Sequence, residues 1–149
     1  MRQVSRRDVV VLGAGVAALS MWPHGAYANA KEAADEIAKF TGGKTAEKGK
    51  IAIELPEIAE NGNTVPLMVT VNSPMQDNDY VSDILIVSEG NPRPGVAHFH
   101  LTPMSGKAVA SARIRLAATQ NIVVVAKTSK GALYTAQKLV KVTIGGCGG

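Results

Sequence analysis

The sequence predicts an all-β protein, an immunoglobulin-like antiparallel β-sandwich with a short N-terminal helix and a flexible C-terminal arm. Three observations predict this class. Beyond residue 50, several runs are apolar at every second position, as in half-buried strands. Clusters of Gly, Pro, Asn, Ser or Thr bound each run. The 149 residues suffice for one domain, and seven such runs at this spacing are typical of a sandwich.

The first 30 residues are typical of a cleaved export signal. Arginines that include the pair Arg6 and Arg7 precede a mildly apolar run over residues 9–22, and Ala28-Asn29-Ala30 then supplies an A-x-A cleavage site. The adjacent arginines resemble the twin-arginine signal of bacteria, which predicts a periplasmic protein. An ordinary secretory signal is the alternative.

The remaining chain divides into three segments. Residues 31–49 predict a helix and a linker, with the helix over residues 31–40 ending before Gly42-Gly43. Residues 50–144 predict the β-sandwich, and residues 145–149 the arm. The predicted strands cover residues 51–55, 65–71, 81–87, 96–101, 109–116, 122–126 and 133–144. The run over residues 81–87 is more continuously apolar than the others.

Composition excludes several classes of protein. The chain has a single cysteine, which excludes a disulfide framework within it. No apolar run reaches the ~20 residues of a spanning helix, so we expect no membrane span. The net charge is +4, and no basic run carries interleaved aromatic residues, so nucleic-acid binding is not expected. We expect no cofactor.

The C-terminus carries the chemistry. Gly145, Gly146, Gly148 and Gly149 flank Cys147. Glycine has the greatest backbone freedom and no side chain to bury, so the sequence predicts a thiol on a flexible arm rather than a buried cysteine. An intermolecular disulfide remains open, because the predicted compartment is oxidising.

Cys147 lacks the surroundings of a catalytic cysteine. Neither a basic residue nor a helix end is adjacent, and no general base is held beside it. A thiol of this kind can still serve other enzymes as a covalent handle. The sequence therefore predicts a carrier and not an enzyme.

The tail and two internal segments resemble the SoxY family, the cysteine-bearing subunits of SoxYZ thiosulfate-oxidation carriers. The internal segments are residues 55–66, LPEIAENGNTVP, and residues 91–101, where NPRP leads into AHFHL. This resemblance implies that Cys147 holds the sulfur intermediates and that the four glycines provide reach. It also implies a heterodimer with a SoxZ-like subunit and three enzyme partners, namely a haem cytochrome, a sulfate-releasing hydrolase and a sulfur dehydrogenase.

A second interpretation comes from two histidines. His98 and His100 are two residues apart, so they face the same side of a strand, and Met104 is nearby in sequence. Such residues could bind copper in an exported β-sandwich. The alternative is that both histidines are structural. Asp77, Asp79 and Asp83 also form an acidic cluster, which is typical of a solvated turn.

Overall fold

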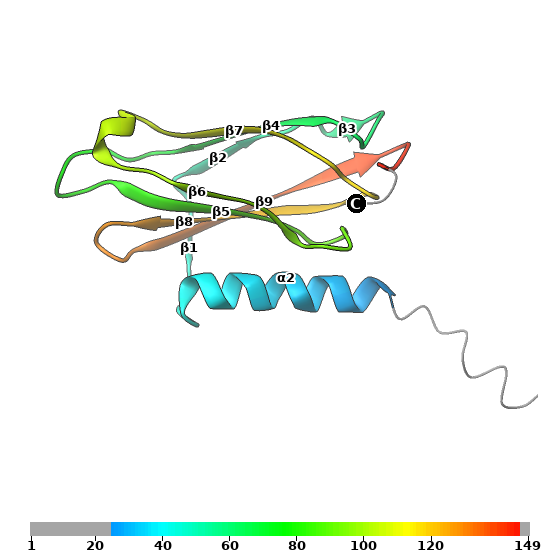
Figure 1. The fold of residues 1–149 in the computed structure, drawn as a ribbon, viewed down its shortest axis with the longest axis horizontal. Coiled ribbons are helices and arrows are strands. Elements are labelled where there is room, and N and C mark those ends of the chain that lie inside the picture. Colours follow the sequence, from blue (N-terminus) through cyan, green and yellow to red (C-terminus); the bar gives the residue numbers. More distant parts are fainter. Residues whose placement is uncertain (1–24, 147–149) are drawn as a thin grey trace, which may run out of the picture.

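The computed structural model describes residues 25–146, and side chains from residue 30 onward. Two sheets pack face to face and one helix lies against the outer face of the larger sheet (Figure 1). The all-β sandwich with a short N-terminal helix is confirmed. Its elements are α2 (Gly25–Thr41), β1 (Glu47–Lys48), β2 (Ile51–Glu54), β3 (Ile58–Ala59), β4 (Val65–Val71), β5 (Val81–Ser88), β6 (Gly95–His100), the 3-10 helix η2 (Pro103–Ser105), β7 (Ala108–Ile114), β8 (Gln120–Thr128) and β9 (Leu133–Val142).

The larger sheet has the order β1-β9-β8-β5-β6, and the smaller one has the order β2-β4-β7. The pairs β5–β6, β5–β8 and β8–β9 are antiparallel, as are both pairs of the smaller sheet. β1 and β3 were not predicted. Both are two residues long and pair in parallel with β9, opposite Tyr134-Thr135 and Lys141-Val142.

The core lies between the two sheets. Alternate residues of β4 are buried there, including Leu67 and Val69, and they meet Ile84 and Ile86 of β5 and Val124 of β8. This is the period-two pattern that the sequence predicted.

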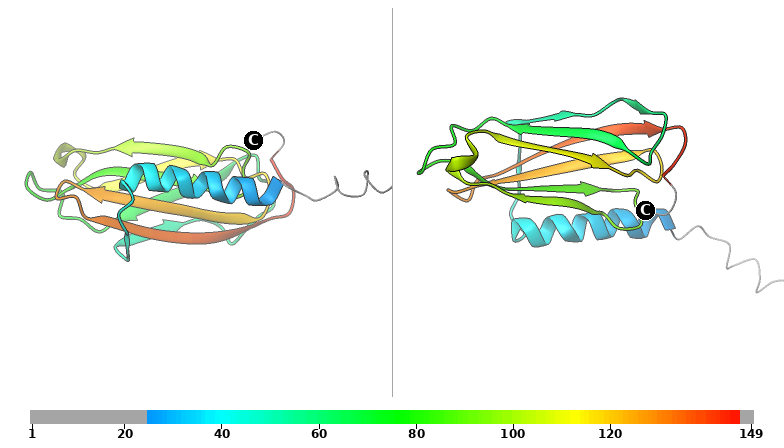
Figure 2. Two further views of the ribbon diagram at one scale, coloured as in Figure 1. Left: turned by 90° about the horizontal axis from the view of Figure 1, so that it is seen from below. Right: turned by 45° about the horizontal axis from the view of Figure 1, so that its top comes forward.

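β5 is buried on both faces, which explains its continuous apolar sequence. Ile84 and Ile86 face the core, whereas Leu85 and Val87 contact Ala33 of α2. The helix runs along this outer face of the sheet, as Figure 2 shows. The described part of the chain contains no helix long and apolar enough to cross a membrane.

α2 ends where the sequence predicted but begins earlier, at Gly25. Its alanine-rich first turns favour helix. At the other end Gly42 and Gly43 have positive φ of 62° and 77°, and the Gly43 N–H donates to the Ala38 carbonyl at 3.1 Å. This left-handed glycine cap stops the helix.

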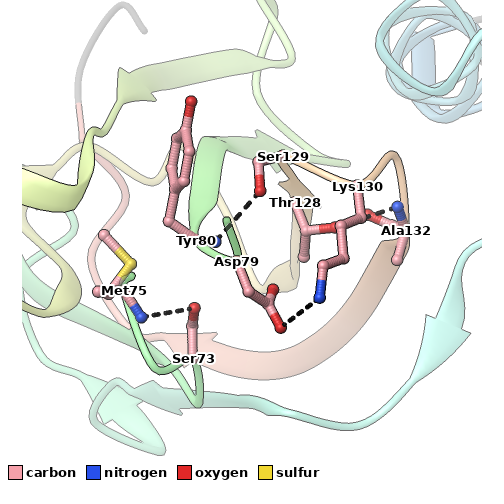
Figure 3. A network of polar contacts seen from close by, with 8 residues as sticks. All are labelled: Ser73, Met75, Asp79, Tyr80, Thr128, Ser129, Lys130 and Ala132. Carbon is pink, nitrogen blue, oxygen red and sulfur yellow. Dashed lines mark hydrogen bonds and ion pairs between the residues drawn. The ribbon is translucent and has the colours of Figure 1, made fainter. Parts of the chain in front are cut away.

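One end of the sandwich is closed by polar contacts between the β4–β5 loop and the β8–β9 turn (Figure 3). Lys130 Nζ lies 3.1 Å from Asp79 Oδ2, and the Tyr80 N–H donates to the Ser129 hydroxyl at 3.2 Å. β9 runs away from this turn, so the C-terminal tail leaves from the opposite end.

Candidate functional site

The chain that leads to Cys147 is fixed to the body of the sandwich. After β9, the Ile144 carbonyl accepts a hydrogen bond from the Gly62 N–H at 2.8 Å. The Gly146 N–H donates to the Leu116 carbonyl at 2.9 Å, and the Leu116 N–H donates to the Gly62 carbonyl at 2.8 Å. Two backbone hydrogen bonds thus join residues 144–146 to Gly62 and to Leu116 after β7, and a third joins Leu116 to Gly62.

These contacts require glycine because the backbones approach too closely for a side chain. A Cβ on Gly62 would lie 2.2 Å from the Leu116 carbonyl oxygen and 2.8 Å from the Gly146 nitrogen. A Cβ on Gly145 would lie 2.2 Å from the Ala117 carbonyl oxygen, and Gly146 itself is buried. Both Gly145 and Gly146 therefore pack against neighbouring backbone, and their contribution to the flexibility of the arm stays a prediction.

A buried amide pair holds the segment on which the tail packs. Asn91 Nδ2 donates to the Arg115 carbonyl at 2.7 Å, and Asn91 Oδ1 accepts from the Ala117 N–H at 2.9 Å. Gln120 Nε2 donates to the same oxygen at 2.9 Å. The sequence analysis did not predict this role. The only indication in the sequence is that an asparagine and a glutamine lie next to apolar strands, where buried amides often hold loops together.

Cys147, Gly148 and Gly149 lie outside the described residues, as do Arg6 and Arg7. Cys147 follows directly after Gly146, the residue whose N–H is hydrogen-bonded to the Leu116 carbonyl. Three fully extended residues span at most ~10 Å. The predicted thiol would therefore act close to this end of the sandwich.

A second cluster lies on the helix-side face of the larger sheet. In the β5–β6 register Asp83 is opposite His100, and Leu85 is opposite His98. Asp83 Oδ1 is 3.1 Å from His98 Nε2 and 2.7 Å from His100 Nδ1. Partial burial alone would raise the pKa of the Asp83 carboxyl, but hydrogen bonds from Ser82, His100 and His98 outweigh it and hold that pKa below its ordinary value.

The other residues of the copper prediction are placed differently. Met104 lies in η2 with its side chain 97% exposed. Two aspartates of the predicted acidic cluster have different partners, because Asp79 pairs with Lys130 and Asp83 pairs with the histidines. Sequence reasoning missed Asp83 as a neighbour of the histidines. Only the pairing of β5 with β6 brings these side chains together.

Comparisons with known proteins point to one family. Residues 37–147 match the model of the sulfur oxidation protein SoxY. The structure of the sulfur carrier protein SoxY from Chlorobium limicola f thiosulfatophilum is 39% identical, with a TM-score of 0.65, over 77% of this chain and 99% of that one. No curated protein sequence matches.

More distant structures share the fold alone. The superoxide reductase (neelaredoxin) from Ignicoccus hospitalis is 18% identical over 63% of this chain and 80% of that one, with a TM-score of 0.57. The superoxide reductase from Nanoarchaeum equitans is 10% identical over 64% of this chain and 100% of that one, with a TM-score of 0.52.

Proposed function

The chain belongs to the SoxY family of sulfur oxidation proteins, and we propose that it is a periplasmic carrier of thiosulfate-oxidation intermediates. In this proposal Cys147 holds each intermediate covalently and presents it to partner enzymes. The protein itself is not an enzyme, because its conjugate is the substrate of those partners. A relative described as a sulfur carrier, 39% identical over 77% of this chain, supports the carrier role.

The anchored chain at Gly146 is the observation that carries the assignment to Cys147. The family match extends to residue 147, and the cysteine is the only one in the sequence. Its preceding residue is held by a hydrogen bond to Leu116 at the end of the sandwich. A thiol that follows such a fixed point can enter the active site of another protein while the sandwich stays outside.

The proposed chemistry needs nothing from this chain except the sulfur atom. The Cys147 thiol and the outer sulfur of thiosulfate form an S–S bond. The thiol loses one proton, and a haem cytochrome takes up the two electrons. A hydrolase then adds water across the S–S bond to the sulfonate, which releases sulfate and a proton and leaves a persulfide on Cys147. A sulfur dehydrogenase oxidises that outer sulfur further.

Intact mass spectrometry tests this function. The chain is purified from cells grown on thiosulfate that lack the sulfate-releasing hydrolase, so that the first conjugate accumulates. We expect the mass of a thiosulfonate adduct that a reductant removes, and no adduct on the Cys147→Ser variant. An unmodified wild-type chain under these conditions would contradict the proposal.

The compartment is part of the proposal. Export by the twin-arginine route, with cleavage after Ala30, would remove the first turns of α2. The helix contacts the sheet through Ala33, Ile37 and Phe40, which all follow this site. Cleavage would therefore leave the described contacts intact. A periplasmic chain that begins at Lys31, absent when Arg6 and Arg7 are both changed to lysine, is the expected result.

The SoxZ-like partner has a suitable surface on the smaller sheet. The outer face of β4 and β7 carries exposed Met68 and Val109, and α2 covers the opposite side of the molecule. Shallow grooves on this face pass beside Met68 and Thr70. We expect Met68→Arg to weaken heterodimer formation in gel filtration, whereas Leu139→Arg, an exposed position on β9, should not. If Leu139→Arg weakened the heterodimer and Met68→Arg did not, the interface would lie on β9 instead.

A further inference from the structure

We infer that Asp83, His98 and His100 form a binding site for a divalent transition-metal cation, either Cu²⁺ or Zn²⁺. Each residue offers one ligand atom, and all three atoms lie within 4.8 Å of one another. Two imidazoles and a carboxylate are a donor set that suits these ions better than Mg²⁺ or Ca²⁺. This site is independent of the carrier role of Cys147.

The strand register builds the cluster on a rigid support. Asp83 of β5 is opposite His100 of β6, and His98 is on the same face two residues earlier. The pairing of β5 with β8 shifts between Val81 and Asp83, which leaves Ser82 as the extra residue. A bulge of this kind redirects the side chains beside it. It places Asp83 on the helix side while Val81 and Ile84 are both in the core.

The two distances from Asp83 Oδ1 to the histidines are close to those in a metal site. Bonds from such an ion to nitrogen or oxygen are about 2.0–2.2 Å, so neighbouring ligand atoms lie about 3–3.5 Å apart. Asp83 Oδ1 is already 3.1 Å from His98 Nε2 and 2.7 Å from His100 Nδ1. A bound cation would replace the imidazole hydrogens that now point to the carboxylate. Each histidine would then keep its proton on its other ring nitrogen.

Surrounding groups hold two of the three ligands in place. The Ser82 hydroxyl lies 2.7 Å from Asp83 Oδ2, which orients the carboxylate and leaves Oδ1 toward the histidines. The Phe40 ring of α2 meets the His98 ring edge to face, with the ring centres 5.4 Å apart. Such outer contacts commonly orient metal ligands.

The site is open to solvent and far from the tail. The His100 side chain is 74% exposed, so an ion can enter and exchange, and water can complete its coordination. β5 and β9 run in the same direction, because both are antiparallel to β8. Asp83 is near the start of β5 and Gly146 follows the end of β9, so the two sites lie at opposite ends of the sandwich (Figure 1).

Calorimetric titration with Cu²⁺ and with Zn²⁺ tests the inference. The chain carries Cys147→Ser, so that the thiol cannot bind the ion and carrier chemistry plays no part. We expect one saturable site per chain that loses about tenfold or more in affinity in Asp83→Asn and His100→Gln. The matched control is Asp79→Asn, which neutralises an aspartate that pairs with Lys130 outside the cluster and should bind as the parent does.

Electron paramagnetic resonance of the Cu²⁺-loaded chain supplies a second readout. We expect hyperfine splitting from two imidazole nitrogens in the parent and from one in His100→Gln. Because His100 is largely exposed, this variant should keep the fold, which circular dichroism checks. Unchanged affinity and unchanged nitrogen splitting in His100→Gln would overturn the site, as would a parent chain that binds neither ion with one-to-one stoichiometry.

Discussion

Replacement of Gly62 with alanine should detach the chain that leads to Cys147. The new methyl group would lie 2.2 Å from the Leu116 carbonyl oxygen and 2.8 Å from the Gly146 nitrogen. Both neighbours are backbone atoms, so neither can move aside as a flexible side chain would. The loop at Gly62 and residues 144–146 must therefore separate.

The energetic cost follows from the hydrogen bonds that break on this separation. Gly62, Leu116, Ile144 and Gly146 share three backbone hydrogen bonds of 2.8–2.9 Å. At a net value of about 0.5–1.5 kcal/mol each, their loss lowers the free energy of unfolding by about 1.5–4.5 kcal/mol. Urea denaturation measures this change. Hydrogen exchange of the Gly146 amide should also become faster than in the parent chain.

Gly95→Ala is the matched control, because a Cβ on Gly95 has no atom within 4 Å. Its stability should stay unchanged or rise by less than about 1 kcal/mol. A loss below about 1 kcal/mol in Gly62→Ala, together with slow exchange at Gly146, would show that the tail does not depend on this close packing.

Three further predictions concern the support of the tail, the helix and the thiol. Asn91→Ala removes the acceptor and donor that hold residues 115–117, and should cost about 2–3 kcal/mol in urea denaturation and speed exchange at Gly146; a change under about 0.5 kcal/mol would refute this role. Ala33→Glu places a charge at the contact of α2 with the sheet, where Ala33 is 1% exposed. It should lower the free energy of unfolding by about 1–3 kcal/mol and speed hydrogen exchange along the helix, whereas Ala34→Glu on the exposed side should do neither. In air the purified chain should form dimers through Cys147 that a reductant separates, as judged on a non-reducing gel; a chain that stays monomeric would mean that the thiol is shielded.

The sequence predicted the seven longer strands because each is an apolar run bounded by turn residues, and in β4 the buried positions alternate as the pattern requires. The continuous run over residues 81–87 also reflected a physical cause, since β5 is covered on one face by the core and on the other by α2. β1 and β3 escaped prediction because two residues cannot display a period. Their positions depend on β9, which is distant in sequence.

The site was predictable in its residue types but not in its contacts. The glycines around Cys147 are evident from the sequence, and they predicted a flexible backbone. The structure adds that Gly145 and Gly146 pack against neighbouring backbone, which the sequence did not reveal. The difference arises because close backbone contact and flexibility both call for glycine. Asp83 was grouped with the aspartates near it in sequence, since only the strand register reveals its position beside the histidines.

The outer edge of β9 is closed at both ends, and this affects how two copies can associate. β1 pairs with its beginning and β3 with its end, while Lys138 Nζ between them donates to the Leu55 carbonyl at 2.8 Å. An edge strand with free backbone groups invites sheet-to-sheet pairing between molecules. Because β9 is protected, two chains joined through Cys147 cannot extend their sheets along it. Reduction of the disulfide should then leave no dimer that is held together by pairing along β9.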